Sequence, residues 1–502
     1  MQGPRIDRAL FFAAAAAVLA VCIPLGLMSE QAGPVVEDVY NWIAANLGVF
    51  YQLFGIGTML FLGWLAFGRY GSVRLGGHDE RPDFSTFSWA GMLFCAGTGA
   101  SLLVWSGVEW AFYIDAPPYG AEPRSPAAIA WASSYGPFHW GITAWCFYAL
   151  PTIAIAYPFY VKNVPHLRAS TALHSILGSA GENSAIGRAV DLAMMIALLG
   201  GAGTSLGVIA PTIAATVAEL SGVQTSFMLE LLVMGVCIGL FALSVYLGIE
   251  KGIKRLSDLN VYLALGLLAY ILLVGPTLFI LKASTDTVGF MLGNFVRMMS
   301  WTDPIEQTGF VETWTIFYWA WWIAFAPAIG IFVTRISRGR SIRQVVLSMI
   351  FFGTLGCWVF YFVLGNYSLW LELNEVISVT GSIADHGMYV TVANIIETLP
   401  FGPLAMAVFA VVSVISVATT YDSASYTLAS AATSELKEGD NPARWHRLFW
   451  ASMLGMLPIF MMFLGGLPII RSGVLIASLP LLAVGVAMAV ALAKSLRQRA
   501  SD

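Results

Sequence analysis

Apolar residues in this sequence gather in long runs that short polar segments separate. A helix that crosses a lipid bilayer needs roughly 20 predominantly apolar residues. Twelve runs come close to or exceed that length, so the pattern predicts an all-α polytopic membrane protein with twelve transmembrane helices. The predicted spans are 9–28, 48–68, 87–114, 135–160, 188–217, 226–249, 260–282, 313–335, 343–366, 400–432, 448–466 and 473–493.

The first predicted span resembles a secretory signal peptide, because Arg5 and Arg8 precede its apolar run. The run is longer than the usual apolar core of such a peptide. Keeping it also gives the even number of spans that the loop charges favour. We therefore expect it to remain in the protein as a helix.

Composition supports the membrane class. Of the 502 residues, 58% are hydrophobic and 11% are charged, whereas about 25% of residues are charged in an average soluble protein. The net charge of −4 does not indicate nucleic-acid binding, because the charges lie in loops. The five cysteines lie in apolar runs without disulfide or metal spacing, so packing is their expected role.

Basic residues predict the orientation of the chain. With the N-terminus inside, 21 of the 25 Lys and Arg residues fall on one side of the membrane. The opposite loops hold only Arg124, Lys282, Arg297 and Arg471. Because cytoplasmic loops carry the excess of basic residues, we expect both termini in the cytoplasm.

One stretch, Thr313 to Arg343, places tryptophans at an unusual depth. Trp normally lies at the membrane–water interface, but Trp321 and Trp322 lie roughly 15 Å into their span at the rise of a helix. Rings at this depth are suited to a cation without hydrogen-bonding protons, which a ring face attracts. Packing against neighbouring helices is the alternative role for either ring.

Two predicted spans contain sequences that favour a break in the helix. Gly97 to Ser101 interrupts the third span, and Ala418 to Ser423 interrupts the tenth. Irregular backbone at membrane depth is tolerated where it lines a cavity, and hydroxyls beside freed carbonyls suit a small hard cation. Close helix packing is the alternative for the glycines.

Three ionisable residues in or beside the spans have open roles. Asp422 either serves function, as intramembrane carboxylates often do, or bonds neighbouring Ser423 or Ser425. We expect Glu109 at the solvated outer mouth and not as a substrate ligand. We expect His139 to be a hydrogen-bonded structural residue. Segments 286–300 and 387–398 have the pattern of amphipathic helices at the interface.

Four separated motifs carry a resemblance to a known family. They are GxGxS at Gly97 followed by GVEWAFY, FHWGITAWCFY, KGIKRLSDLN, and FYWAWWIAFAPAIGIFVTRISRGRSIR. In this order they resemble the signature of the betaine/choline/carnitine transporter family, from about residue 45 to the end of the twelfth span. The EWAFY variant and short termini look closest to the carnitine branch.

The resemblance implies a LeuT-like fold of two inverted five-helix repeats after two extra helices. The expected units are 1–86 with two peripheral helices, 87–283 as the first repeat, 284–312 as an amphipathic linker, 313–493 as the second repeat, and 494–502 as a short cytoplasmic tail. It also implies residence in the cytoplasmic membrane, within the lipid bilayer, and a possible homotrimer.

The resemblance further implies an aromatic box for a quaternary ammonium or sulfonium substrate. Carried over by motif, its rings would be Trp140, Trp145, Tyr148, Trp321 and Trp322. Phe325 stands where the betaine branch tends to have Trp, and Phe112 where the carnitine branch has Tyr. Both keep a ring but change its polar edge, so glycine betaine, choline and carnitine all stay open as substrates.

Ion coupling is implied by the same resemblance, with no organic cofactor. One sodium site of the family would map to backbone at Cys95 and Thr98 with the hydroxyls of Thr419 and Thr420. A second site would fall on Leu198 and Ala202, which lack side-chain ligands. The sodium-independent exchangers of the family have an arginine near the start of span seven, and none occurs around Asn260. The pattern favours one sodium ion, with sodium-independent exchange as the alternative.

Two other functional classes fit the sequence less well. A transporter-like sensor would carry a soluble output domain, and the loops here are short. An intramembrane enzyme would need a convergent set of nucleophile, base or metal. No HExxH, P-loop or CxxC framework occurs, so we expect no enzymatic activity.

Overall fold

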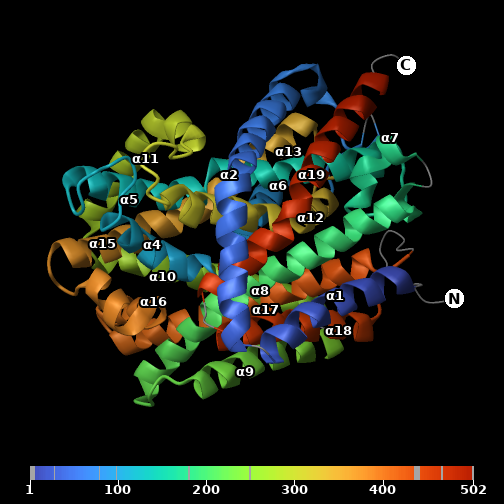
Figure 1. Cartoon of the computed structure of the whole chain (residues 1–502). Coiled ribbons are helices and arrows are strands. Elements are labelled where there is room, and N and C mark those ends of the chain that lie inside the picture. The colour runs from blue at the N-terminus through green and yellow to red at the C-terminus, as the bar shows by residue number, and fades with distance from the viewer. Residues whose placement is uncertain are drawn as a thin grey trace.

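The computed structural model is almost entirely helical. It describes residues 6–27, 29–77, 80–97, 99–178, 181–247, 250–434, 441–464 and 467–499. Within these ranges the only β-type pairings are two isolated bridges, Ile6 with Thr433 and Arg74 with Ser341. This confirms the all-α class: the protein consists of helices packed on one another (Figure 1).

In the described residues, the first half of the chain holds ten helices and three short 3₁₀ turns. Their bounds are α1 Arg8–Leu27, α2 Ser29–Phe67, η1 Arg69–Ser72, α3 Thr86–Gly97, α4 Leu102–Ile114, α5 Pro126–His139, α6 Ile142–Val161, η2 Ser170–Leu173, α7 His174–Leu177, η3 Gly181–Asn183, α8 Ala185–Ser221, α9 Phe227–Leu247 and α10 Glu250–Val274.

The second half contains three π-helical turns among its helices. The bounds are α11 Thr277–Ser300, η4 Val311–Ile316, α12 Phe317–Ile336, α13 Ile342–Ser348, η5 Met349–Gly353, α14 Thr354–Phe360, η6 Tyr361–Gly365, α15 Asn366–Leu373, α16 Val379–Glu397, α17 Gly402–Ala431, α18 Arg444–Leu464 and α19 Leu467–Arg499. The π turns are η4, η5 and η6. Such turns often occur at functional sites, and η4 and η6 both supply side chains to the site described below.

Each predicted span overlaps one or more helices, but fewer helical segments qualify as membrane spans by length and apolar composition. In the described ranges eight helical segments are long and apolar enough to cross a bilayer, or nine if α3 and α4 form one span bent by 52°. The described apolar parts of α1 and α9 are shorter. The protein is therefore a multi-pass helical membrane protein.

Helix α12 lies at the centre of the packing. It packs on α6, α19 and α8, and every side chain from Phe317 to Ala324 is buried. Helices α2 and α19 pack against each other across the front of the view in Figure 1. The tryptophan-rich segment is thus enclosed by protein on several sides and does not face lipid.

One predicted break is present and another is wrong. Helix α3 ends at Gly97 and α4 begins at Leu102, as the glycines predicted. Helix α17, in contrast, is continuous from Gly402 to Ala431. The hydroxyls of Thr419 and Thr420 donate to carbonyls of the same helix, so they find hydrogen-bond partners without a break in it.

An unpredicted break lies between α5 and α6, at Trp140 and Gly141. Trp140 has φ −100° and ψ 8°, and Gly141 has φ −103° and ψ −135°. The carbonyl of Pro137, which Gly141 N–H would use in a regular helix, accepts instead from Trp358 Nε1 at 2.7 Å. A distant indole therefore stabilises this break, which local sequence could not indicate.

The seventh span and its neighbour also differ from expectation. Helix α10 ends at Val274, so the predicted span to 282 is interrupted at Gly275 and Pro276. Helix α11 then starts at Thr277, earlier than the amphipathic segment predicted from 286. In α16, the backbone of Gly387 is non-helical, with φ 79°, at the start of the predicted segment 387–398.

Candidate functional site

Six aromatic side chains from the α5–α6 break, α6, α12 and η6 form one buried group, here called the tryptophan cluster. Its members are Trp140, Tyr148, Tyr318, Trp321, Trp322 and Tyr361. Each is at most 7% exposed. The cluster lies where the α5–α6 break meets the first turns of α12.

The rings of the cluster contact one another directly. Trp321 and Trp322 stack at 5.4 Å between centroids with planes 3° apart. Trp140 meets Trp322 edge to face at 4.6 Å, and Tyr148 meets Trp322 at 6.2 Å. With these separations no cation fits between Trp140 and Trp322, so the cluster is closed in this structure.

The three indole N–H groups of the cluster are fixed by hydrogen bonds. Trp140 Nε1 donates to Glu109 Oε2 at 3.2 Å. Trp321 Nε1 donates to the Gly201 carbonyl at 3.2 Å, and Trp322 Nε1 donates to the His139 carbonyl at 2.8 Å. With their polar edges satisfied, the rings have only their faces left for a ligand.

Glu109 is fully buried beside this cluster, so the expectation of a solvated outer-mouth carboxylate was wrong. Its oxygens accept from Tyr113 Oη at 2.6 Å, from Trp140 Nε1 and from Tyr361 Oη. His139 Nδ1 lies 3.3 Å from Oε1. These four contacts fill roughly the four acceptor positions of a carboxylate, so Glu109 offers charge to a ligand without a free hydrogen-bonding position.

His139 connects Glu109 to α12, in agreement with its predicted hydrogen-bonded role. Its Nε2 lies 3.1 Å from Thr315 Oγ1, and its ring stacks on Tyr318 at 4.7 Å. Because its carbonyl also holds Trp322, the residue pair Glu109 and His139 positions two of the tryptophans. Tyr361 was missed from the sequence, since it reaches the cluster only because Gly136 of α5 leaves room: a Cβ there would lie 2.3 Å from Tyr361 Cε1.

Three predicted ring ligands lie apart from the tightest part of the cluster. Trp145 contacts Tyr148 at 5.2 Å and lies over Gly353, where a Cβ would come within 2.1 Å of its ring. Phe325 is half-buried against Gly201. Phe112 packs on Trp105 and Trp314. In the described part of the chain no ring contact joins Phe325 or Phe112 to Trp140 or Trp322.

Phe112 belongs to a second group of rings, here called the Trp314 cluster. Its members are Trp105, Phe112, Tyr113, Trp314 and Phe317. The guanidinium of Arg471 lies 4.3 Å from the Trp314 ring centroid and 5.1 Å from that of Phe317. Within the described ranges no carboxylate forms an ion pair with Arg471, so the faces of Trp314 and Phe317 hold its charge.

The predicted sodium ligands are only partly placed. Thr419 Oγ1 donates to the carbonyls of Ile415 and Ser416 at 3.0 and 3.1 Å, and Thr420 Oγ1 donates to that of Ser416 at 2.8 Å. Cys95 lies half-buried near the end of α3, which packs on η5, α14 and α12. Thr98 lies outside the described residues. The sodium site therefore stays a prediction.

Two further positions bear on ion coupling. Leu198 and Ala202 are buried in α8 and offer only apolar side chains. Asn260 of α10 lies in the stretch where the sodium-independent exchangers of the family have an arginine. Its Nδ2 donates to Ser416 Oγ at 2.8 Å. A neutral amide thus contacts the turn of α17 that carries Thr419 and Thr420.

Asp422 forms an ion pair that the sequence analysis did not predict. Its Oδ1 lies 2.7 Å from Arg447 Nη2 of α18. Ser425 Oγ instead donates to the Asp422 backbone carbonyl at 3.1 Å. Tyr426 lies between two guanidinium groups, those of Arg335 at 4.9 Å and Arg447 at 5.4 Å. The pair ties α17 to α18, and its partner lies 25 residues away in sequence.

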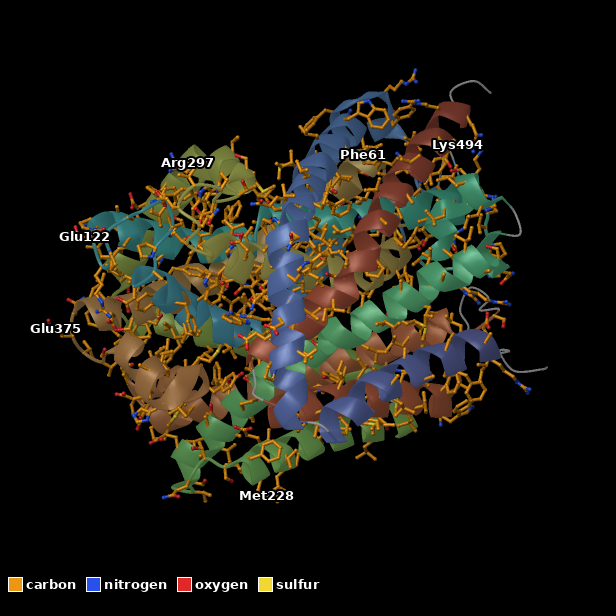
Figure 2. The ribbon with its side chains drawn as sticks, viewed as in Figure 1. Phe61, Glu122, Met228, Arg297, Glu375 and Lys494 are labelled. Atoms are coloured by element: carbon orange, nitrogen blue, oxygen red, sulfur yellow. The ribbon has the colours of Figure 1, made fainter. Side chains whose placement is uncertain are left out.

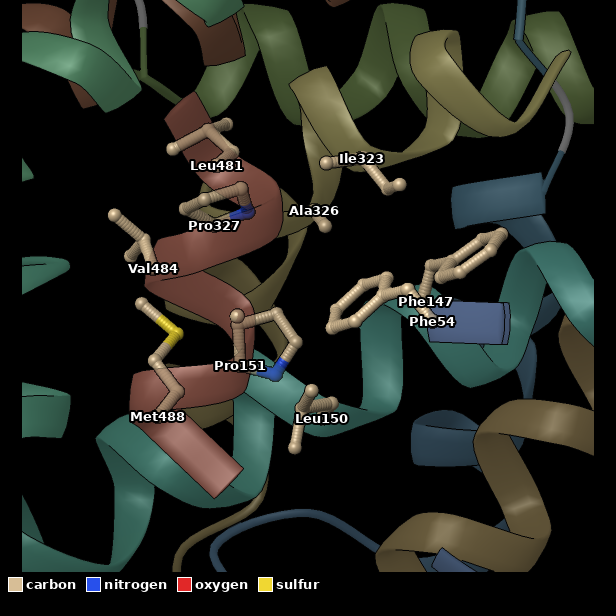
Figure 3. A pocket seen from close by; sticks show the side chains of 11 residues that line it. Phe54, Phe147, Leu150, Pro151, Ile323, Ala326, Pro327, Leu481, Val484 and Met488 are labelled. Atoms are coloured by element: carbon tan, nitrogen blue, oxygen red, sulfur yellow. The ribbon is translucent and has the colours of Figure 1, made fainter. Parts of the chain in front are cut away.

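A small cavity of about 20 Å³ lies between α2, α6, α12 and α19 (Figure 3). Its lining is apolar and includes Phe54, Phe147, Pro327 and Met488. No ring of the tryptophan cluster lines it. Without polar partners such a space does not hold an ordered ion or water, so it is a packing defect and not the candidate binding site.

Comparison with known proteins identifies the family. The family model of the betaine/carnitine/choline family transporters matches residues 9–501. The chain is 36% identical over 422 residues to the uncharacterized transporter YeaV of Escherichia coli (strain K12), covering 84% of this chain and 87% of that protein. It is 33% identical over 462 residues to the carnitine transporter of Acinetobacter baumannii (strain ATCC 19606), covering 92% and 83%. This chain, with its buried tryptophans at the α5–α6 break, on α6 and on α12, therefore belongs to the betaine/carnitine/choline transporter family.

Proposed function

We propose that this protein is a secondary active transporter of a quaternary ammonium or sulfonium compound, such as glycine betaine, carnitine or choline. The tryptophan cluster carries the proposal. Its rings lie at the centre of a multi-pass helical protein, their N–H groups are bonded, and a buried carboxylate lies 3.2 Å from Trp140 Nε1. Ring faces with a nearby negative charge suit a methylated cation.

The architecture supports alternating access. We take α1, α9 and α18 as three further spans, which together with the nine segments described above make twelve. We also propose that the helices form two inverted five-helix repeats that follow two extra helices. The break between α3 and α4 lies where a repeat of this kind places its unwound helix. The oligomer proposed from the resemblance is a homotrimer.

Contacts near the two ends of the chain support an orientation in which both termini lie on the cytoplasmic side of the cell membrane. Asp7, near the start of the chain, pairs with Arg188 and its N–H bonds the Ala432 carbonyl. Ser175 bonds Ala491 near the other end. These residues all lie in or beside segments predicted to be cytoplasmic. On the opposite side, Arg124 pairs with Glu372.

For coupling, we propose one sodium ion bound between the α3–α4 break and Thr419 with Thr420. The alternative is sodium-independent exchange of two related substrates. The continuity of α17 favours that alternative. The hydroxyls of Thr419 and Thr420 donate within their own helix and keep their oxygen lone pairs for a cation, which favours the sodium site. We propose no enzymatic activity.

Uptake into proteoliposomes tests both coupling modes. Labelled glycine betaine, carnitine, choline and dimethylsulfoniopropionate would be offered with and without an inward sodium gradient. Uptake that requires the gradient supports symport, whereas uptake only into vesicles preloaded with substrate supports exchange. No uptake or counterflow of any of these compounds would contradict the proposed function.

A further inference from the structure

The carboxyl group of Glu109 is buried beside the tryptophan cluster, and within the described residues no Lys or Arg pairs with it. Its side chain is fully shielded from solvent, and in the described part of the chain its one ion-pair contact is with His139 at 3.3 Å. A buried carboxylate with no compensating charge is strongly unfavourable. A proton or a cation at this position removes that cost.

The titratable groups that face Glu109 or its partner His139 come from four elements. Tyr113 lies on the same helix, Tyr135 and His139 on α5, Tyr318 on α12, and Tyr361 on η6. Helices α8, α15 and α16, which also pack on α4, give Glu109 no hydrogen-bond or ion-pair partner within the described residues. Apart from the imidazole, these facing side chains are all phenols, which are neutral near physiological pH.

The guanidinium of Arg471 is the positive charge on the far side of these tyrosines. It acts electrostatically on Tyr113 and Tyr318 but lies over the rings of Trp314 and Phe317. It therefore does not form a salt bridge with Glu109. The local charge of Glu109 and His139 together is set by how many protons the pair holds.

The network can hold an extra proton without losing its contacts. A phenolic hydroxyl can either donate or accept, so the Tyr113 or Tyr361 hydroxyl can accept from a protonated Glu109. His139 can hold the proton instead, with Nδ1 toward Glu109 Oε1 and Nε2 toward Thr315 Oγ1 at 3.1 Å. In both cases the net charge of the pair is zero.

We propose that Glu109 and His139 form a proton-binding site that the cation of the substrate empties, so that proton and substrate exclude each other. This rests on the proposed function, since it takes the tryptophan cluster as the substrate site. A cation on the Trp140 ring lies close to Glu109, because Trp140 Nε1 and Glu109 Oε2 are 3.2 Å apart. The substrate replaces one positive charge by another: the pair loses one proton to the solution and the site gains one fixed cation.

The experiment is titration calorimetry of the purified full-length protein with whichever compound of the uptake panel binds. Binding is measured between about pH 5.5 and 8.5 in buffers that differ in ionisation enthalpy, which counts the protons released. We expect up to one proton released per substrate bound at the acidic end. Because the binding of one substrate releases one proton, substrate affinity should fall by about tenfold for each pH unit below the midpoint of the pH dependence.

Glu109→Gln separates a proton site from a structural role, since glutamine keeps the shape of the side chain and one of its two acceptor oxygens. We expect weaker binding that no longer depends on pH and releases no proton. Glu122→Gln is the matched control, because Glu122 is exposed at the edge of the molecule (Figure 2). This control should release protons like the wild type.

The outcomes distinguish this inference from the proposed function. Wild-type binding without proton release would overturn the proton site and leave the transporter proposal intact. Proton release by Glu109→Gln equal to that of the wild type would also overturn it. If Glu109→Gln does not fold, the wild-type proton count and pH slope still decide. Absence of binding of every compound would instead contradict the proposed function.

Discussion

The Trp314 cluster and the tryptophan cluster adjoin each other and both contact Glu109, but they differ in what covers their ring faces. Around Trp314 the ring faces already hold a cation of the protein itself, Arg471. Around Trp322 the nearest charged group is the buried carboxyl of Glu109, reached through Trp140, and no Lys or Arg of the described residues lies over the rings. Aromatic content alone therefore does not define the site. The charge beside the rings decides which cluster is free to accept a foreign cation.

The largest expected effect concerns the substrate and tests whether the tryptophan cluster selects a fixed charge. Glycine should compete at least about a hundredfold more weakly than glycine betaine, because each of its three stranded N–H donors costs roughly 1 kcal/mol or more. Glu109 does not relieve this cost, since its acceptor positions are filled. Competition against a labelled substrate gives the ratio, and equal inhibition by both compounds would exclude such a site.

The next effect compares the two clusters by mutation. Trp322→Ala should weaken substrate binding at least about thirtyfold, because a desolvated cation–π contact contributes about 2 kcal/mol or more. Trp140→Ala should behave likewise, and Trp145→Ala should lose less, since Trp145 reaches the cluster through Tyr148. Tryptophan fluorescence titration of the purified variants measures the affinity.

Trp314→Ala is the matched control for Trp322→Ala. It removes a buried ring of the same size whose face is covered by Arg471. We expect its substrate affinity to change by less than about threefold, because a face that already holds a cation contributes little to a second one. If Trp314→Ala weakens binding as much as Trp322→Ala does, the two clusters act together and their contrast is lost.

A third prediction asks whether ion coupling is separate from both clusters. Replacing Thr419 and Thr420 together by Ala should raise the sodium concentration for half-maximal uptake by about tenfold, roughly 1.4 kcal/mol. Substrate affinity at saturating sodium should stay near that of the wild type. With Leu198 and Ala202 lacking side-chain ligands, the Hill coefficient for sodium should be near one.

The measurement for this third prediction is uptake against sodium at fixed ionic strength. Ion and substrate should tighten each other's binding by the same factor, since their linkage is reciprocal. Full uptake in sodium-free buffer would favour the exchange alternative. The single variant Ser452→Ala, on the exposed face of α18, should leave the sodium dependence unchanged.

The smallest effect on binding is expected at Arg471. Arg471→Gln removes the cation from the faces of Trp314 and Phe317, so it should lower the free energy of unfolding by about 1 kcal/mol. Substrate affinity should change by less than about twofold. A thermal unfolding series in detergent, with and without substrate, measures both. A large loss of affinity with unchanged stability would show that Arg471 takes part in substrate binding.

Local pattern was enough for the helices and for one break. The apolar runs predicted where helices lie, because a segment that crosses lipid must satisfy its backbone N–H and C=O groups by hydrogen bonds within itself. Gly97 and Gly99 predicted the end of α3 because their backbone is weakly restrained. The same local reasoning was wrong for α17, where Thr419 and Thr420 bond within the helix.

The sequence by itself determined the class of this protein, the positions of its helices and the depth of its tryptophans, since these depend on hydrophobicity and on residues close along the chain. Only the tertiary structure decided what surrounds the tryptophans. The break at Trp140 depends on Trp358, and Glu109 is buried by Tyr361 from 252 residues away. These contacts join helices that are remote in sequence, and a carboxylate in a span has the same local pattern whether it faces water or protein. Its burial, and with it the charge of the candidate site, follows from how α4, α5, α12 and η6 pack together.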